Sequence, residues 1–225
     1  MIRTVSAALP RIALFLLALV PVVTVFFILQ SMASGALNPL TEPADLARRA
    51  SYPWAVIGHM LGGSAILMLG LAQFSTRLRR AAPRLHRWNG RALVAAGCWI
   101  ALSALWMNAS PKALPDTFLH EAAQDVVAVV FLAVLALGVY AIRTGHIATH
   151  RAWMMRAYAI TLGAATQTVM LLPVFLIFGP PIGLIADLVF ISGWLINLAV
   201  AEVLIRRGQL APRRNGSIST APNRS

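Results

Sequence analysis

The residues of this sequence best suited to chemistry are its histidines: His59, His86, His120, His146 and His150. An imidazole changes charge near neutral pH and is the commonest metal ligand in proteins, so each histidine is a candidate proton carrier or ligand. The single cysteine, Cys98, excludes a disulfide framework and a cysteine-based metal site. The sequence has neither a glycine-rich phosphate loop nor a nucleophile elbow. The elements that position the histidines therefore decide what they can do.

Those elements are apolar runs, each long enough for a helix to cross a bilayer, which takes about 20 residues. They cover residues 12–34, 52–75, 89–110, 118–142, 152–178 and 182–205. Helices are expected because an open strand cannot satisfy its backbone in lipid. We therefore predict an all-α integral membrane protein with six transmembrane helices over 1–207, its first helix retained rather than cleaved as a signal peptide. Residues 208–225 are predicted to be a disordered tail.

The distribution of basic residues predicts the orientation of these helices. The chain carries 19 Lys and Arg against 7 Asp and Glu, a formal charge of +12. Short cytoplasmic loops are enriched in Lys and Arg, which places both termini in the cytoplasm. The basic residues expected inside include Arg77, Arg79, Arg80, Arg84, Arg87, Arg91, Arg143, Arg151, Arg156, Arg206, Arg207, Arg213 and Arg214. Topology thus explains the charge without nucleic acid, and the inner face should attract anionic lipid.

Four of the histidines alternate between the two membrane faces. His59 and His120 are predicted near the outer ends of the second and fourth helices, and His86 and His150 near the inner starts of the third and fifth. In a central four-helix bundle of helices two to five, each of these pairs lies on diagonal helices. Two imidazoles facing each other are what a six-coordinate b-type haem requires. The pattern predicts one or two haems, held by axial pairs near opposite faces.

Arginines next to the inner histidines have two interpretations. Haem carries two propionates, and Arg forms strong bidentate pairs with carboxylates. Candidate partners of the propionates are Arg87, Arg91, Arg151 and Arg156. The alternative is that these arginines simply anchor the cytoplasmic side of the helices.

Glycines on the histidine faces also have two interpretations. Gly63 and Gly70 lie on the face of His59, Gly97 on that of His86 and Gly138 on that of His120. A flat macrocycle needs such room beside a helix. Small residues also let membrane helices approach each other closely.

Other ionisable residues keep two different function classes open. His146 and His150 have the spacing of a metal-chelating pair, although His146 beside Gly145 is better explained as a solvated loop residue. Glu121, Asp125 and Asp187 lie near the outer ends of helices four and six. With His120 they would serve a proton- or cation-coupled transporter of small molecules. A structural or sensor protein with pH-responsive histidines and no cofactor is the third alternative.

Several motifs resemble those of a known membrane family. HMLGG from His59, GLAQF from Gly70, RLHRWNGR from Arg84 and HRAWMMRAY from His150 resemble the bacterial family catalogued as domain of unknown function 2306, over about residues 50–205. That family brings no established activity.

The order of the histidines is similar to that of the cytochrome b561 superfamily, six-helix di-haem electron carriers. The resemblance implies His59 with His120 and His86 with His150 as axial ligands, and electron transfer across the membrane. The pattern departs from that superfamily at His86 and His150, which lie at helix ends among arginines. A quinone and a small soluble reductant are both left open as electron donor, and the acceptor and oligomeric state are not indicated.

Overall fold

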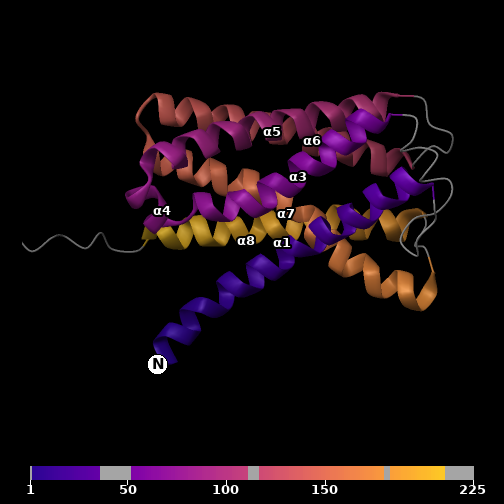
Figure 1. Cartoon of the computed structure of the whole chain (residues 1–225), viewed down its shortest axis with the longest axis horizontal. Helices are drawn as coiled ribbons and strands as arrows, with labels where there is room; N and C mark the ends of the chain where they lie inside the picture. Colours follow the sequence, from indigo (N-terminus) through magenta and orange to yellow (C-terminus); the bar gives the residue numbers. More distant parts are fainter. Residues whose placement is uncertain (1, 36–51, 111–116, 180–182, 211–225) are drawn as a thin grey trace, which may run out of the picture.

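The protein is built from helices, as seen in a computed structural model that describes residues 2–35, 52–110, 117–179 and 183–210. Long helices run beside one another and α1 crosses them obliquely (Figure 1). The helices are α1 (Ile2–Ser34), α3 (Pro53–Gln73), α4 (Thr76–Ala81), α5 (Pro83–Ala109), α6 (Phe118–Arg143), α7 (Ile147–Phe178) and α8 (Gly183–Leu210). The six predicted helices are therefore all present, and α4 is an addition in a loop for which none was predicted.

Local sequence explains where these helices begin. Pro53 and Pro83 occupy first-turn positions of α3 and α5, where their missing N–H costs nothing. The hydroxyls of Ser75 and Thr117 cap α4 and α6, accepting hydrogen bonds from the backbone N–H of Leu78 at 3.2 Å and of His120 at 3.1 Å.

Three helices begin earlier than the apolar runs predict, and α1 differs most, beginning at Ile2 rather than at residue 12. α5 begins at Pro83 rather than near residue 89, and α7 at Ile147 rather than near 152. The first turns of α5 and α7 include polar and charged residues, such as Arg84, His86 and His150, which an apolar count leaves out. As a result, His86 and His150 both lie inside helices rather than before them.

At the other boundaries, the predicted and observed helix ends differ little, or the boundary lies outside the described residues. α8 continues to Leu210, so the last helix exceeds its predicted end at 205. Most of the predicted tail, from 211 onwards, lies outside the described residues, as do residues 36–51.

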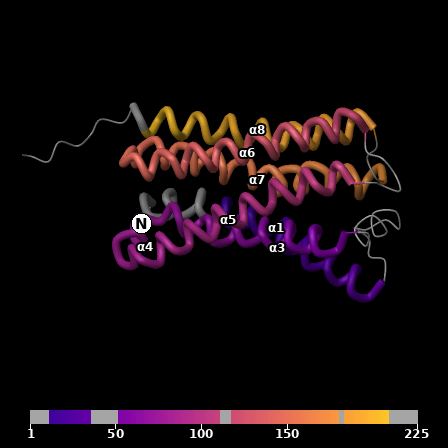
Figure 2. Tube along the Cα trace, turned by 90° about the horizontal axis from the view of Figure 1, so that it is seen from above, coloured from indigo at the N-terminus to yellow at the C-terminus, as the bar shows by residue number. Residues whose placement is uncertain are grey.

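The packing order of the long helices places two pairs on diagonals. α3 packs against α1, α5 and α7, while α6 packs against α5, α7 and α8, and α7 also packs against α8 and α1. Within the described residues, no close backbone contact joins α3 to α6 or α5 to α7. Seen from above, α6, α7 and α8 lie on one side and α1, α3 and α5 on the other (Figure 2).

Glycines allow the helices to approach closely at three points in the core. Gly70 lies against the Tyr158 ring, Gly97 against Leu135, and Gly138 against Met154. These three glycines therefore serve helix packing, one of the two interpretations of their positions. Gly63 differs, since a Cβ there would meet no atom within 4 Å.

The outer surface of the helices is apolar, as expected in lipid. Large side chains such as Trp54, Phe118 and Phe178 are more than four-fifths exposed. Among the described residues, six helices have the length and composition to cross a membrane: α1 from Ile12, α3, α5, α6, α7 and α8 to Gly208. Exposed apolar side chains along long helices favour a multi-pass membrane protein over a soluble bundle.

The Gly70 contact predicts the effect of adding one methyl group. In Gly70→Ala the new Cβ would lie 2.8 Å from a Tyr158 ring carbon, and that ring is held by its hydroxyl bond to the Leu67 carbonyl. We expect overpacking to lower the free energy of unfolding by about 1–3 kcal/mol, measured as a lower melting temperature of the purified protein in detergent. Gly208→Ala, where nothing lies within 4 Å, is the control and should not lower it. Equal melting temperatures for the two variants would contradict this packing.

Candidate functional site

His59 projects from α3 with one ring nitrogen already committed. Its Nδ1 lies 3.1 Å from the carbonyl oxygen of Ile100 and 3.0 Å from Oγ of Ser103, both on α5. A carbonyl oxygen can only accept, so the bond to Ile100 assigns the proton to Nδ1. The lone pair of Nε2 is then free for a ligand or a proton.

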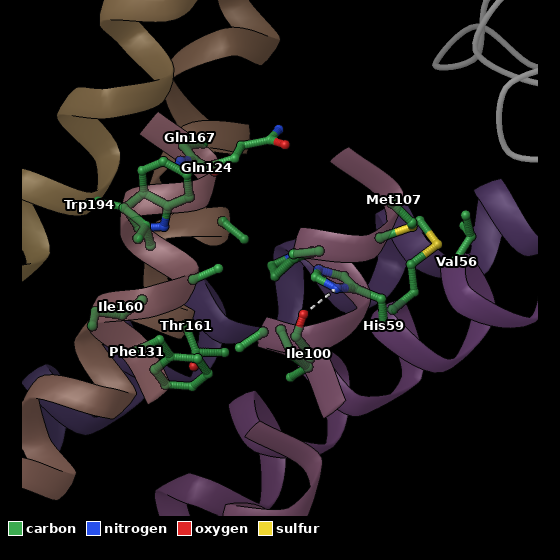
Figure 3. Close-up of a pocket in the computed structure, with 18 of the residues that line it drawn as sticks. Val56, His59, Ile100, Met107, Gln124, Phe131, Ile160, Thr161, Gln167 and Trp194 are labelled. Carbon is green, nitrogen blue, oxygen red and sulfur yellow. Dashed lines mark hydrogen bonds between the residues drawn. The ribbon is translucent and has the colours of Figure 1, made fainter. Parts of the chain in front are cut away.

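A cavity of about 440 Å³ lies beside His59 among the long helices. That volume is within the range of small-molecule sites, roughly 300–1,000 Å³. Figure 3 draws His59 on one side of the cavity and Gln124, Gln167 and Trp194 across from it. Most of the other lining side chains are apolar, such as Val56, Leu67 and Phe131. Gly63 also lines it, and its open environment is the space beside a helix that the sequence suggested.

His120, the predicted partner of His59, does not line this cavity. Its Nε2 lies 2.8 Å from Nε2 of Gln124, and its Nδ1 lies 3.4 Å from Oδ1 of Asp187 on α8. The Phe190 ring packs against the imidazole at 4.3 Å between centroids. Both ring nitrogens of His120 therefore have protein partners, and Gln124 borders the cavity in its place.

Asp187, the acidic neighbour of His120, is a residue whose role the sequence left open. It is 4% exposed, and its second oxygen accepts a hydrogen bond from the Thr117 hydroxyl. A buried carboxylate needs such partners, because burial without them is expensive. The sequence groups Asp187 with His120 but does not predict their direct contact, which arises from the packing of α6 against α8.

The inner pair of histidines lies on the diagonal helices α5 and α7. Nδ1 of His150 lies 2.8 Å from the carbonyl oxygen of Gly138, which leaves its Nε2 free as in His59. Nδ1 of His86 is buried and has no partner among the described residues.

The four arginines named from the sequence have different surroundings. Arg156 donates from Nε and Nη2 to one oxygen of Glu202, at 3.1 and 2.8 Å, and stacks over Trp153. Arg91 stacks over Trp88, while Arg87 and Arg151 are exposed. The Arg156 charge is thus already paired within the protein.

The remaining candidates take part in local structure. His146 is the residue before α7, and its Nδ1 lies 2.9 Å from the Thr144 hydroxyl. Asp125 accepts a hydrogen bond of 2.8 Å from Asn108, which also donates to the carbonyl oxygen of Glu121. In the part of the chain that the structure describes, no group of three or more His, Cys, Asp or Glu side chains could hold a metal ion.

The burial of Asp187 predicts that its carboxylate stabilises the N-terminal ends of α6 and α8. Asp187→Ala would leave the Thr117 hydroxyl and the His120 N–H without their acceptor, at a cost of about 1–3 kcal/mol. Asp187→Asn keeps an acceptor oxygen and should lose less, and Asp125→Ala, at an exposed site, should lose least. Melting temperatures in detergent test this order, and a loss in Asp125→Ala equal to that in Asp187→Ala would contradict it.

Comparison with known proteins gives the family of the chain. A family model described as a predicted membrane protein, domain of unknown function 2306, matches residues 56–205. No curated protein and no solved structure matches the chain. The matched segment covers most of the chain and holds all the histidines, while α1, which contributes Pro21 and Val25 to the cavity lining, precedes it. The chain therefore belongs to the family of membrane proteins catalogued as domain of unknown function 2306.

Proposed function

We propose that this protein is a membrane electron-transfer protein that binds a b-type haem between His86 and His150. The observation that carries the proposal is the placement and hydrogen bonding of these two imidazoles. They come from diagonal helices, one is oriented by a backbone carbonyl, and the other has a buried nitrogen without a partner. A buried polar atom without a partner calls for an explanation, and a missing ligand is one.

The hydrogen bond of His150 supports ligation in particular. Histidines that bind metals almost always donate their other ring N–H to a carboxylate, a carbonyl or water, which fixes the tautomer and the ring plane. The Gly138 carbonyl provides that acceptor at 2.8 Å from Nδ1. Nε2 of His150 is therefore the nitrogen that would bind iron.

The outer pair fits a second haem less well. His59 is oriented in the same way as His150, with Nδ1 hydrogen-bonded to the Ile100 carbonyl and Nε2 free. His120 would first have to leave Gln124 and Asp187. We therefore assign one haem to the inner pair and keep the outer pair as a prediction that the haem-to-protein ratio tests.

The chain's own residues would orient the cofactor and its charge. A bound b-type haem with two imidazole ligands supplies one-electron chemistry without an open iron position. Arg87 and Arg151, which are exposed beside the inner histidines, are the candidate partners of the propionates. Arg156 already pairs with Glu202 and is the weaker candidate.

The positive-inside distribution would put this haem near the cytoplasmic face of a bacterial inner membrane, beside anionic lipid. The partners would then be a donor and an acceptor of single electrons. A quinone or a small reductant fits that role. The similarity of the histidine order to the cytochrome b561 superfamily supports the same function.

A proton- or cation-coupled transporter is the second candidate, and Asp187 favours it. An ionisable residue within a membrane helix is a functional candidate by default, and Asp187 is both buried and paired with His120. This alternative requires proton-coupled uptake into liposomes that Asp187→Asn abolishes. The same preparation would show no haem spectrum.

The haem proposal predicts b-type bands in a reduced-minus-oxidised spectrum of the protein purified after expression with ample haem. His86→Ala and His150→Ala should each remove the bands, since one imidazole no longer has its partner across the iron. The measurement is the haem-to-protein ratio, which we expect to be close to one in the unchanged protein and far below that in these two variants.

The control is His146→Ala, which removes an exposed imidazole at the start of the same helix as His150. It should keep the full spectrum. A protein without b-type bands, or equal loss in His146→Ala and His150→Ala, would overturn the assignment. A ratio near two that His59→Ala or His120→Ala lowers to one would instead identify a second haem at the outer pair.

A further inference from the structure

Three polar residues that border the cavity beside His59 each have a hydrogen-bond acceptor available, while Ser64 and Trp194 in the same lining carry donors. The first is Nε2 of His59, because the bond to the Ile100 carbonyl places the ring proton on Nδ1. A neutral imidazole in this tautomer offers a lone pair to the cavity and no N–H.

Gln167 provides a second acceptor from α7. It is 5% exposed, and its amide nitrogen donates to the carbonyl oxygen of Phe190 at 2.7 Å. Because that carbonyl accepts, the assignment of nitrogen and oxygen in the amide is fixed. Oε1 has no partner among the described residues, and Gln167 lines the cavity.

Gln124 provides a third acceptor from α6, through a chain of hydrogen bonds. Asp187 faces Nδ1 of His120, so this nitrogen carries the ring proton and Nε2 accepts. The Gln124 amide nitrogen then donates to Nε2 at 2.8 Å. Its amide oxygen remains free of this contact, on a residue that lines the cavity.

We propose that this cavity binds a neutral, apolar molecule carrying hydroxyl donors, such as a hydroquinone, rather than a second haem. Three acceptors in an apolar chamber of about 440 Å³ are each costly to leave unpaired, and a ligand with O–H groups satisfies them. An analogue without donors would leave them unpaired. Among the described residues that line the cavity, His59 alone is acidic or basic, so a neutral ligand fits better than an ion.

Gly63 allows the cavity to be filled without disturbing its walls. A Cβ at Gly63 would meet no atom within 4 Å, and the residue lines the cavity. Leu has a higher helix propensity than Gly, so Gly63→Leu should leave α3 intact while occupying the ligand's space. Gly208→Leu is the matched control, since Gly208 also has no neighbour within 4 Å and does not line the cavity.

The test is isothermal titration calorimetry of the full-length protein in lipid nanodiscs, with empty nanodiscs as the blank. The two probes are decylhydroquinone and its dimethyl ether, which share a ring and a chain but differ in the two O–H donors. The protein is kept reduced under argon, so that binding is measured without electron transfer. We expect the hydroquinone to bind at least tenfold more tightly than the ether.

The variants connect that preference to the cavity. Gly63→Leu should weaken hydroquinone binding at least tenfold and Gly208→Leu should not change it. His59→Phe keeps an aromatic ring but loses the acceptor, so it should reduce the preference for the hydroquinone over the ether. Equal affinities for the two probes, absence of binding, or full binding by Gly63→Leu would overturn the proposal.

The haem-to-protein ratio of Gly63→Leu separates this proposal from the one above. Filling the cavity should leave the ratio unchanged, because the inner histidines lie outside it. A lower ratio would show that the cavity holds haem and would also overturn the hydroxylated ligand. If the unchanged protein binds the hydroquinone but shows no b-type bands, only the haem at His86 and His150 is refuted.

Discussion

Polar groups inside a membrane protein must find partners within the protein, since lipid supplies none, and this constraint organises the bundle. The Tyr158 hydroxyl donates to the Leu67 carbonyl, and the Asn197 amide donates to Thr166 and to the Gly193 carbonyl. These bonds join α7 to α3 and to α8. Where partners are complete, a polar residue is explained by packing. Atoms left over, such as Nε2 of His59 and Nδ1 of His86, are therefore the informative ones.

The sequence predicts the helices well because length and hydropathy decide membrane insertion. It places the start of α5 and α7 too late, since polar and charged residues follow closely after Pro83 and Ile147. The apolar criterion detects the segment that lipid covers, whereas the backbone hydrogen bonds of a helix continue through polar residues beyond it. That difference matters for His86 and His150, which gain the rigidity of a helix.

The candidate site was less predictable, because it depends on side chains meeting across helices. Helical periodicity places His120 on a face but cannot reveal that Asp187 from α8 reaches it. Similarly, Gly70 and Gly63 share a face, yet the first receives the Tyr158 ring and the second borders a cavity. Trp194, which packs on Gly163, forms part of the wall opposite His59. Distinctions of this kind arise from the three-dimensional packing of large side chains against small ones.

The length of α7 has a consequence for the depth of its first residues. Its 32 residues extend about 48 Å at roughly 1.5 Å per residue, against a hydrocarbon layer of about 30 Å. The excess must lie among lipid headgroups, and a moderate tilt absorbs only part of it. His150, one turn from the start of α7, then lies close to the headgroup layer. A water-soluble molecule could approach this imidazole without entering the hydrocarbon.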